Sequence, residues 1–203
     1  MKTIHDFFKL IHNPHRLRML EMIYGSKDGG CNVGYLCDEF ERLGLNASSV
    51  STYLGDLEET GIIRRERAGK YVNYLADDRY APARISEAWN CILLMLDGKS
   101  VEERQSLYAN MDRVFEVLMN PFRARVIVAL KEDGSMSSAM ICEKFQHQMK
   151  YLKRDLKIAV VNGLITADDS DVACANYSIS SDIDAFTEKM MELCSDHTSR
   201  NVV

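Results

Sequence analysis

The chain has 203 residues, of which 46% are hydrophobic and 27% charged, a composition typical of a globular protein with one large or two small cores. Its apolar runs fall far short of the roughly 20 residues that span a bilayer, and its start lacks the apolar segment of a signal peptide, so no membrane partner, a cytoplasmic location and reduced cysteines are expected. The net charge of −5 does not exclude a nucleic-acid binder, because local clustering of charge decides that property.

Hydrophobic spacing in the first half of the chain predicts short helices followed by a β-hairpin. Asn13 is suited to cap a helix that begins at Pro14, where the missing proline N–H costs nothing. A later helix, capped by Asn46 or Ser48, is expected to end at Gly61. In chain order, the expected elements are helices over 4–11, 14–24, 33–43 and from 46 or 48 to 60, hairpin strands over 62–67 and 70–76, and a helix over 80–97.

The second half of the chain repeats this order. Asn13-Pro14-His15-Arg16 recurs, with one residue changed, as Asn120-Pro121-Phe122-Arg123, and Gly163 ends a helix as Gly61 does. Self-similarity on this scale indicates two copies of one small domain. The expected elements are helices over 100–119, from 120 through 130, around 140–145 and over 149–162, strands over 164–167 and 173–179, and a helix over 182–195.

Four segments of the first half carry a resemblance to a known family. Residues 13–20 (NPHRLRML) and 48–54 (SSVSTYL) are similar to a "DPTRLRIL" helix and a "SQSTVSRHL" recognition helix. Residues 57–63 (LEETGII) and 64–74 (RRERAGKYVNY) are similar to "LREAGLV" and to a "RREGRWVYY" wing. In this order the motifs resemble ArsR-type winged helix-turn-helix transcriptional regulators, over roughly a third of the chain.

The resemblance, together with the repeat, implies a mainly α fold with small β-hairpin wings, built as tandem winged helix-turn-helix domains. We expect an ArsR-like DNA-binding domain over 1–98 and a second, diverged winged-helix domain over 99–203, where the similarity lies mainly in the order of elements. Members of the family are typically homodimers that repress transcription and release DNA on sensing a metal or another signal.

The first domain carries the side chains that a DNA contact needs. A helix reads the major groove through short or hydrogen-bonding side chains, and a basic hairpin can follow the phosphates. The hairpin has a local charge of +3 after Glu66 is counted. A solvated edge with ordinary cap serines is the alternative for the same residues. The candidate DNA contacts are Ser48, Ser49, Ser51, Thr52 and Tyr53 on the helix, and Arg64, Arg65, Arg67, Lys70 and Tyr71 on the hairpin.

The second domain inverts this charge pattern. Its equivalent helix carries Lys150, Lys153, Arg154 and Lys157 against Asp155, a local charge of +3. Its hairpin carries Asp168, Asp169 and Asp171, which phosphate would repel. The basic helix is therefore a candidate DNA contact or a solvated face. Dimerisation and ligand sensing are equally open roles for this domain.

Metal and catalytic chemistry have weak support. Cys37 matches one cysteine of the metal-sensing members of the family, but Gly34 stands at the partner position, and the helix after the wing has Glu87 and Cys91 without a histidine. No phosphate loop, nucleophile elbow or paired-carboxylate pattern is present. We therefore expect no metal, no cofactor and no enzyme activity.

The leading hypothesis is a DNA-binding transcriptional regulator, a repressor, that contacts operator DNA through the first domain. Its partner is double-stranded DNA, bound by a homodimer on symmetric half-sites or by the two domains of one chain as a pseudo-dimer. The alternative is a winged-helix protein-interaction scaffold without sequence-specific DNA binding, which the net charge of −5 favours. The sequence names no small-molecule effector.

Overall fold

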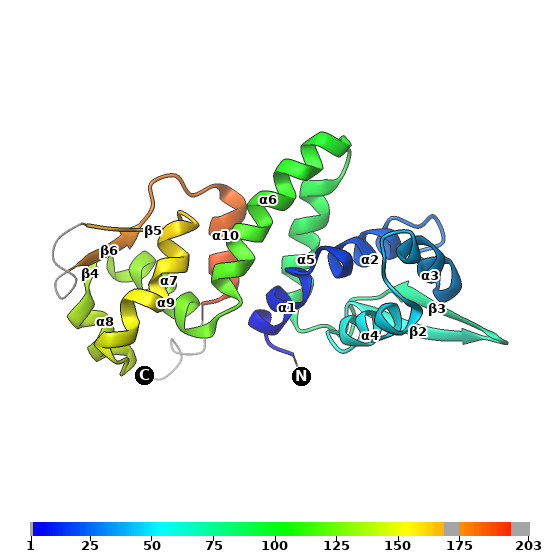
Figure 1. Cartoon of the computed structure of the whole chain (residues 1–203), viewed down its shortest axis with the longest axis horizontal. Helices are drawn as coiled ribbons and strands as arrows, with labels where there is room; N and C mark the ends of the chain where they lie inside the picture. The colour runs from blue at the N-terminus through cyan, green and yellow to red at the C-terminus, as the bar shows by residue number, and fades with distance from the viewer. Residues whose placement is uncertain (1, 169–174, 196–203) are drawn as a thin grey trace. The chain divides into compact units, whose positions relative to one another are not determined.

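The computed structural model describes residues 2–168 and 175–195 (Figure 1). The fold is mainly helical, with two small three-stranded antiparallel sheets. The chain divides into two compact units, unit 1 (Met1–Arg104) and unit 2 (Gln105–Val203). This division falls inside helix α6 (Val101–Leu118), six residues beyond the position 98 expected from sequence. Within the described part, no helix combines the length and the apolarity needed to cross a membrane.

Asparagine side chains cap the starts of helices in unit 1. The Asn13 Oδ1 atom accepts hydrogen bonds from the backbone N–H groups of His15 and Arg16, at 2.9 and 3.2 Å. Asn46 rather than Ser48 caps the later helix, through the backbone N–H of Ser49 at 2.8 Å. The elements are α1 (Ile4–Ile11), α2 (Pro14–Tyr24), β1 (Gly30–Asn32), α3 (Val33–Glu41), α4 (Ala47–Glu58), β2 (Ile63–Ala68), β3 (Tyr71–Ala76) and α5 (Ala83–Leu96).

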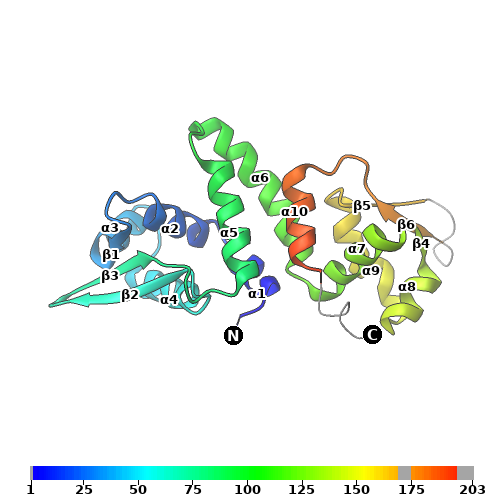
Figure 2. The same ribbon diagram turned by 180° about the vertical axis from the view of Figure 1, so that it is seen from behind.

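The sheet of unit 1 has the order β1-β3-β2. Strands β2 and β3 form the expected hairpin, with Ile63 opposite Ala76 and Ala68 opposite Tyr71. The short strand β1, which sequence reasoning missed, adds to the other side of β3 and places Cys31 opposite Tyr74. Helix α4 packs on α2, α3 and β2, and its inner face is fully buried. The hairpin is thus fixed at its base while its tip extends beyond the helices of unit 1 (Figures 1 and 2).

Unit 2 contains most of α6 and repeats the same succession of elements. Asn120 caps its next helix as Asn13 does, through the backbone N–H groups of Phe122 and Arg123 at 3.0 and 3.1 Å. The sheet order β4-β6-β5 also matches that of unit 1. The elements are α7 (Pro121–Asp133), β4 (Met136–Ser137), α8 (Ser138–Phe145), α9 (Met149–Val161), β5 (Ile165–Ala167), β6 (Asn176–Ile179) and α10 (Ala185–Leu193).

Backbone conformation fixes the register of the repeat between α4 and α9. The turn before α4 has a left-handed residue at Gly44 (φ 83°), and the turn before α9 has one at Gln146 (φ 52°). The turns after the two helices have Gly61 (φ 81°) and Gly163 (φ 72°). Both pairs are 102 residues apart, so each position on α4 has a defined equivalent on α9.

Candidate nucleic-acid interface

The outer face of α4 is neutral and rich in hydroxyl groups. The side chains of Ser48, Ser51 and Thr52 are exposed, while Ser49 is half-buried. The Thr52 hydroxyl donates to the backbone carbonyl of Ser48 at 3.0 Å, so its oxygen can still accept a hydrogen bond from a ligand. Short side chains of this kind allow a helix to approach the base edges of a major groove closely.

Tyr53, the fifth candidate on α4, is held by a contact that sequence reasoning missed. The guanidinium of Arg16 lies over the Tyr53 ring, 4.5 Å from its centroid. The same guanidinium forms an ion pair with Asp56, so this carboxylate of α4, one helical turn after Thr52, is neutralised from α2. Arg16 is therefore a positioning residue for α4, and the motif Asn13-Pro14-His15-Arg16 both caps α2 and anchors the candidate recognition helix.

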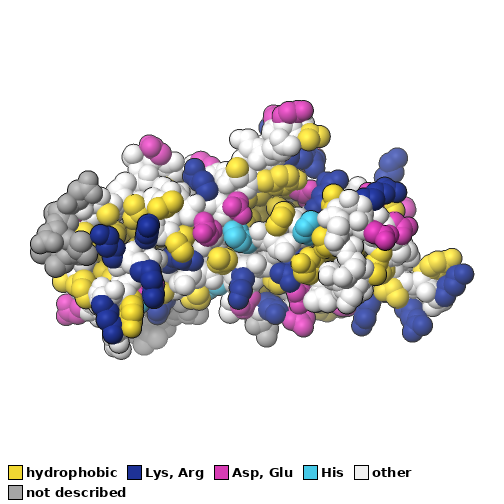
Figure 3. All heavy atoms as spheres, viewed as in Figure 1, with side chains coloured by type: hydrophobic (Ala, Val, Ile, Leu, Met, Phe, Trp, Pro, Cys, Tyr) yellow, Lys and Arg dark blue, Asp and Glu magenta, His cyan; other side chains and the backbone are white. Residues whose placement is uncertain are grey.

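The tip of the β2–β3 hairpin carries cations without acidic partners. Arg67 and Lys70 are exposed, and among the described residues no carboxylate lies within 4 Å of either side chain. The Arg67 Nε atom donates to the Gly69 carbonyl at 3.3 Å, and the Lys70 ammonium lies 5.2 Å from the ring centroid of the exposed Tyr71. Figure 3 shows Lys and Arg side chains gathered at this end of unit 1.

The other two arginines of the hairpin contact carboxylates of unit 1. Arg64 forms ion pairs with Glu66 at 2.7 Å and with Asp77 at 2.9 Å. Arg65 lies 3.9 Å from a Glu58 carboxylate oxygen, and its backbone N–H donates to the same carboxylate at 3.2 Å. Arg64 therefore fastens the base of the hairpin, and Arg67 and Lys70 are the cations best placed for a phosphate contact.

Comparison with known proteins adds nothing to this geometry. No family model, curated protein or solved structure matches the chain. The resemblance of residues 13–74 to ArsR-type regulators therefore stays a prediction from the sequence motifs.

The base of the hairpin contains a buried carboxylate clamped by two arginines. The Asp77 side chain is 4% exposed and accepts hydrogen bonds from Arg79 at 2.7 and 2.8 Å, in addition to the ion pair with Arg64. The Arg79 guanidinium is the main reason that the pKa of Asp77 lies well below its usual range. This clamp connects the end of β3 to β2 and holds the hairpin in its projecting position.

Asp77→Asn is expected to lower the melting temperature of unit 1 at pH 7, because it removes the charge that both arginines contact. The pKa of Asp77 is lower in the folded than in the unfolded chain, so its carboxylate stabilises the fold at pH values above the unfolded pKa of about 3.9. This stabilisation is lost as the pH falls from there toward the pKa of the folded state. The difference between wild type and variant should therefore shrink below about pH 4. Fluorescence melts on the single tryptophan, Trp89, at pH 7 and pH 3 measure this, with the exposed Asp28→Asn as control. Equal differences at both pH values would contradict the assignment.

The candidate residues of unit 2 are placed as follows. Lys150, Lys153, Arg154 and Lys157 are all exposed on α9. On the hairpin, Asp168 accepts hydrogen bonds from the backbone and side-chain N–H groups of Asn176, at 2.7 and 3.0 Å. Asp169 and Asp171, the other two acids expected there, lie outside the described residues. The local charge of −3 assigned to this hairpin therefore stays a prediction.

The cysteines of the α2–α3 region lie on elements other than α4 and the β2–β3 hairpin. Cys31 is buried, and its Sγ atom donates to the Met22 carbonyl at 3.3 Å, whereas Cys37 is half-exposed on α3. Burial raises the pKa of both thiols. In residues 2–168 and 175–195, no three His, Cys, Asp or Glu side chains are grouped closely enough to hold a metal ion.

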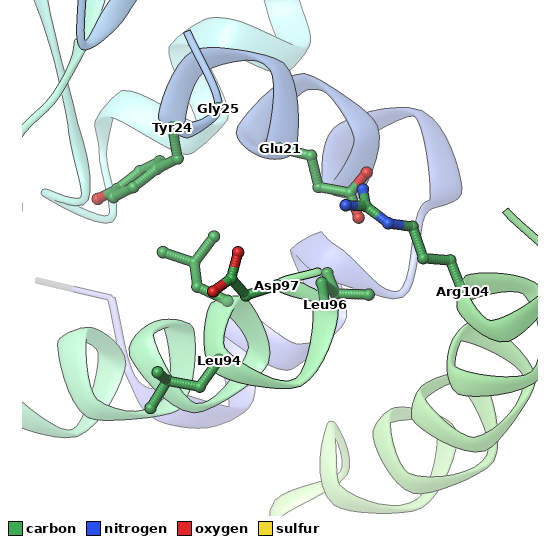
Figure 4. A pocket seen from close by; sticks show the side chains of 8 residues that line it. Glu21, Tyr24, Gly25, Leu94, Leu96, Asp97 and Arg104 are labelled. Atoms are coloured by element: carbon green, nitrogen blue, oxygen red, sulfur yellow. The ribbon is translucent and has the colours of Figure 1, made fainter. Parts of the chain in front are cut away.

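A pocket of about 350 Å³ lies between α2 and α5 of unit 1, on elements other than α4 and the hairpin. Its walls combine the apolar Leu93 and Leu96 with the carboxylates of Glu21 and Asp97 and the guanidinium of Arg104. Figure 4 shows the Arg104 side chain extending toward Glu21 across the pocket. The volume is at the lower end of small-molecule sites, and two carboxylates against one guanidinium do not select a ligand class.

Proposed function

We propose that this protein is a DNA-binding transcriptional regulator whose unit 1 acts as a winged helix-turn-helix. One observation carries the proposal: a helix with a neutral hydroxyl face, α4, packs beside a projecting hairpin whose tip cations have no acidic partner among the described residues. A helix of this kind fits the major groove, about 12 Å wide, while the hairpin reaches the flanking backbone.

The two elements have different tasks in this proposal. Ser48, Ser51 and Thr52 contact base edges, where hydroxyl groups donate or accept hydrogen bonds and the Thr52 methyl can meet a thymine methyl. Arg67 and Lys70 neutralise phosphates and contribute affinity through release of counterions. Such a regulator represses transcription by occupying its operator, either as a homodimer or with both units of one chain on the same duplex. Sedimentation of the free protein and of its DNA complex distinguishes the two assemblies.

The test is fluorescence anisotropy with duplexes from the upstream region of the protein's own gene, across a salt series. Wild type should bind with a steep salt dependence, and Arg67→Ala with Lys70→Ala should weaken binding to every sequence and reduce the slope of log K against log salt by about 1.8. Lys9→Ala with Lys99→Ala removes the same charge from exposed positions of α1 and the α5–α6 turn, and should leave the slope unchanged.

Sequence readout is tested separately with Ser51→Ala and Thr52→Ala on a randomised duplex library. Each lost base contact is expected to cost about 1–3 kcal/mol of discrimination and so to change the preferred sequence. If wild type binds no duplex at low salt, the proposal fails, and the competing function is a winged-helix scaffold for protein partners, which the net charge of −5 favours.

A further inference from the structure

The register of the internal repeat allows the outer faces of α4 and α9 to be compared position by position. With the separation of 102 residues, Ser48 corresponds to Lys150, Ser51 to Lys153 and Thr52 to Arg154. Gly55 likewise corresponds to Lys157, and Ser49 to Tyr151. Four neutral positions of the first helix are thus cationic in the second.

The inner face of α9 is apolar and fixed in unit 2. Leu152, Leu156 and Ala159 are buried, as are the equivalent positions of α4, Leu54 among them. Helix α9 packs on α7, α8 and β5 through this face. The four basic side chains are therefore held on the opposite side of a folded helix.

The three lysines of the basic face have no acidic partner in the described part of the chain. Among the described residues, no carboxylate lies within 4 Å of the Lys150, Lys153 or Lys157 ammonium groups. The ammonium of Lys150 and the guanidinium of Arg154 lie 4.7 and 5.0 Å from the ring centroid of Tyr151, on which both can stack. The face of unit 2 seen in Figure 3 shows a group of Lys and Arg side chains over the region of α7 to α9.

The one acid of α9, Asp155, contacts Arg154 and His147. Its carboxylate contacts Arg154 Nε at 3.1 Å and lies 3.0 Å from His147 Nε2, without hydrogen-bond geometry to that ring. The His147 ring stacks on Phe122 of α7, with centroids 4.0 Å apart. An ordinary solvated helix mixes both signs of charge on its outer face. Here a helix of 13 residues accumulates cations in a chain whose net charge is −5.

We propose that α9 is a second contact to duplex DNA, which binds phosphates without reading the base sequence. The inference rests on the proposed function in one respect, because it gives unit 2 the same ligand, duplex DNA, that is proposed for unit 1. Charge complementarity selects a polyanion, and the shared architecture of α3–α4 and α8–α9 selects the duplex. A rise of 1.5 Å per residue separates Lys150 from Lys157 by about 10.5 Å, close to the width of the major groove. Lysines at both ends of this span can therefore reach phosphates on both sides of one groove.

Sequence readout is assigned to α4 and sequence-independent affinity to α9. Lysine offers a compact point charge rather than the paired donors and acceptors that identify a base, and three of the four cations are lysines. Unit 2 would thus hold the protein on any duplex while unit 1 selects the site. This division agrees with the different side chains at equivalent positions of the two helices.

The test is binding of the full chain to a duplex of random sequence, with Lys150→Gln, Lys153→Gln and Lys157→Gln combined. Each lost phosphate contact should reduce the slope of log K against log salt by about 0.9, so the slope of the triple variant should be smaller by about two to three. At 0.1 M salt, this reduction of the slope predicts that the triple variant binds on the order of 100-fold more weakly than wild type. Lys9→Gln, Lys27→Gln and Lys99→Gln carry the same charge change at exposed positions of unit 1 and should bind like wild type. Circular dichroism melts that match wild type show that both variants are folded.

The outcomes separate this inference from the proposed function. If wild type binds duplex DNA and the α9 variant binds with the same affinity and slope, the inference is wrong while the proposed function stands. If the α9 variant loses binding and Arg67→Ala with Lys70→Ala does not, α9 is the DNA contact and the role of unit 1 is wrong. Poly-glutamate is the last probe. A triple variant that loses affinity for this acidic polypeptide but not for the duplex would overturn the inference in favour of an acidic protein partner.

Discussion

Replacing Gly61 by alanine is expected to destabilise unit 1 by about 3 kcal/mol or more, the combined effect of backbone strain and a steric clash. Gly61 has φ 81°, a left-handed conformation that costs a residue with a Cβ atom about 1–2 kcal/mol. An added Cβ would also lie 2.7 Å from the Tyr80 carbonyl and 2.8 Å from the Ala81 nitrogen. These are backbone atoms, so the clash is relieved only by moving the segment that leads into α5.

The internal repeat supplies a matched control for this prediction. Gly163 stands at the equivalent position of unit 2 with φ 72°, but an added Cβ there meets nothing within 4 Å. Gly163→Ala should therefore cost only the strain of the left-handed conformation. The net loss is about 1 kcal/mol, because alanine also reduces the freedom of the unfolded chain and so offsets part of that strain. Urea unfolding followed by far-UV circular dichroism measures both changes. Similar losses for the two variants would show that the contact with Tyr80 is not rigid.

Leu54→Ala is expected to lower the free energy of unfolding of unit 1 by about 3 kcal/mol, within the usual range for a buried leucine. The Leu54 side chain is fully buried on the inner face of α4. Its removal leaves a cavity under the helix that carries the candidate base contacts. Affinity for duplex DNA should fall at temperatures where the variant begins to unfold, and recover on cooling.

Trp89 makes this second effect measurable in unit 1. It is the single tryptophan of the chain and is fully buried, so its fluorescence reports the unfolding of the unit that contains it. Leu94→Ala, which truncates a side chain that is 78% exposed on α5, is the control and should leave the transition within about 0.5 kcal/mol of wild type. A loss below about 1 kcal/mol for Leu54→Ala would mean that α4 is not held by its inner face.

Local chemistry made much of the fold predictable from sequence. Asn13 caps its helix as expected, and Asn120 caps the equivalent helix of unit 2, because an Asn-Pro pair supplies both an acceptor for free N–H groups and a residue that needs no N–H partner. The β2–β3 hairpin around Ala68 and Gly69 also lies where alternation and turn residues placed it. In each case, residues that are neighbours in the sequence are sufficient to predict the local structure.

Non-local pairing explains what sequence reasoning missed. Strand β1 has three residues and β4 has two, too few for a periodic pattern, and each is defined only by its distant partner, β3 or β6. The engagement of Arg64 by Asp77 and the stacking of Arg16 on Tyr53 likewise join residues from different elements. Charge counting alone could not distinguish Arg64, at the base of the hairpin, from Arg67 near its tip.

The presence of two copies in one chain has a consequence for how the molecule can change over generations. In an assembly of identical subunits, one codon change alters both copies of a surface at once, and a change that harms either copy is lost. Here Ser51 and Lys153 stand at equivalent positions but are encoded separately. Each surface can therefore acquire its own chemistry while the shared backbone plan, including the turns at Gly61 and Gly163, is retained.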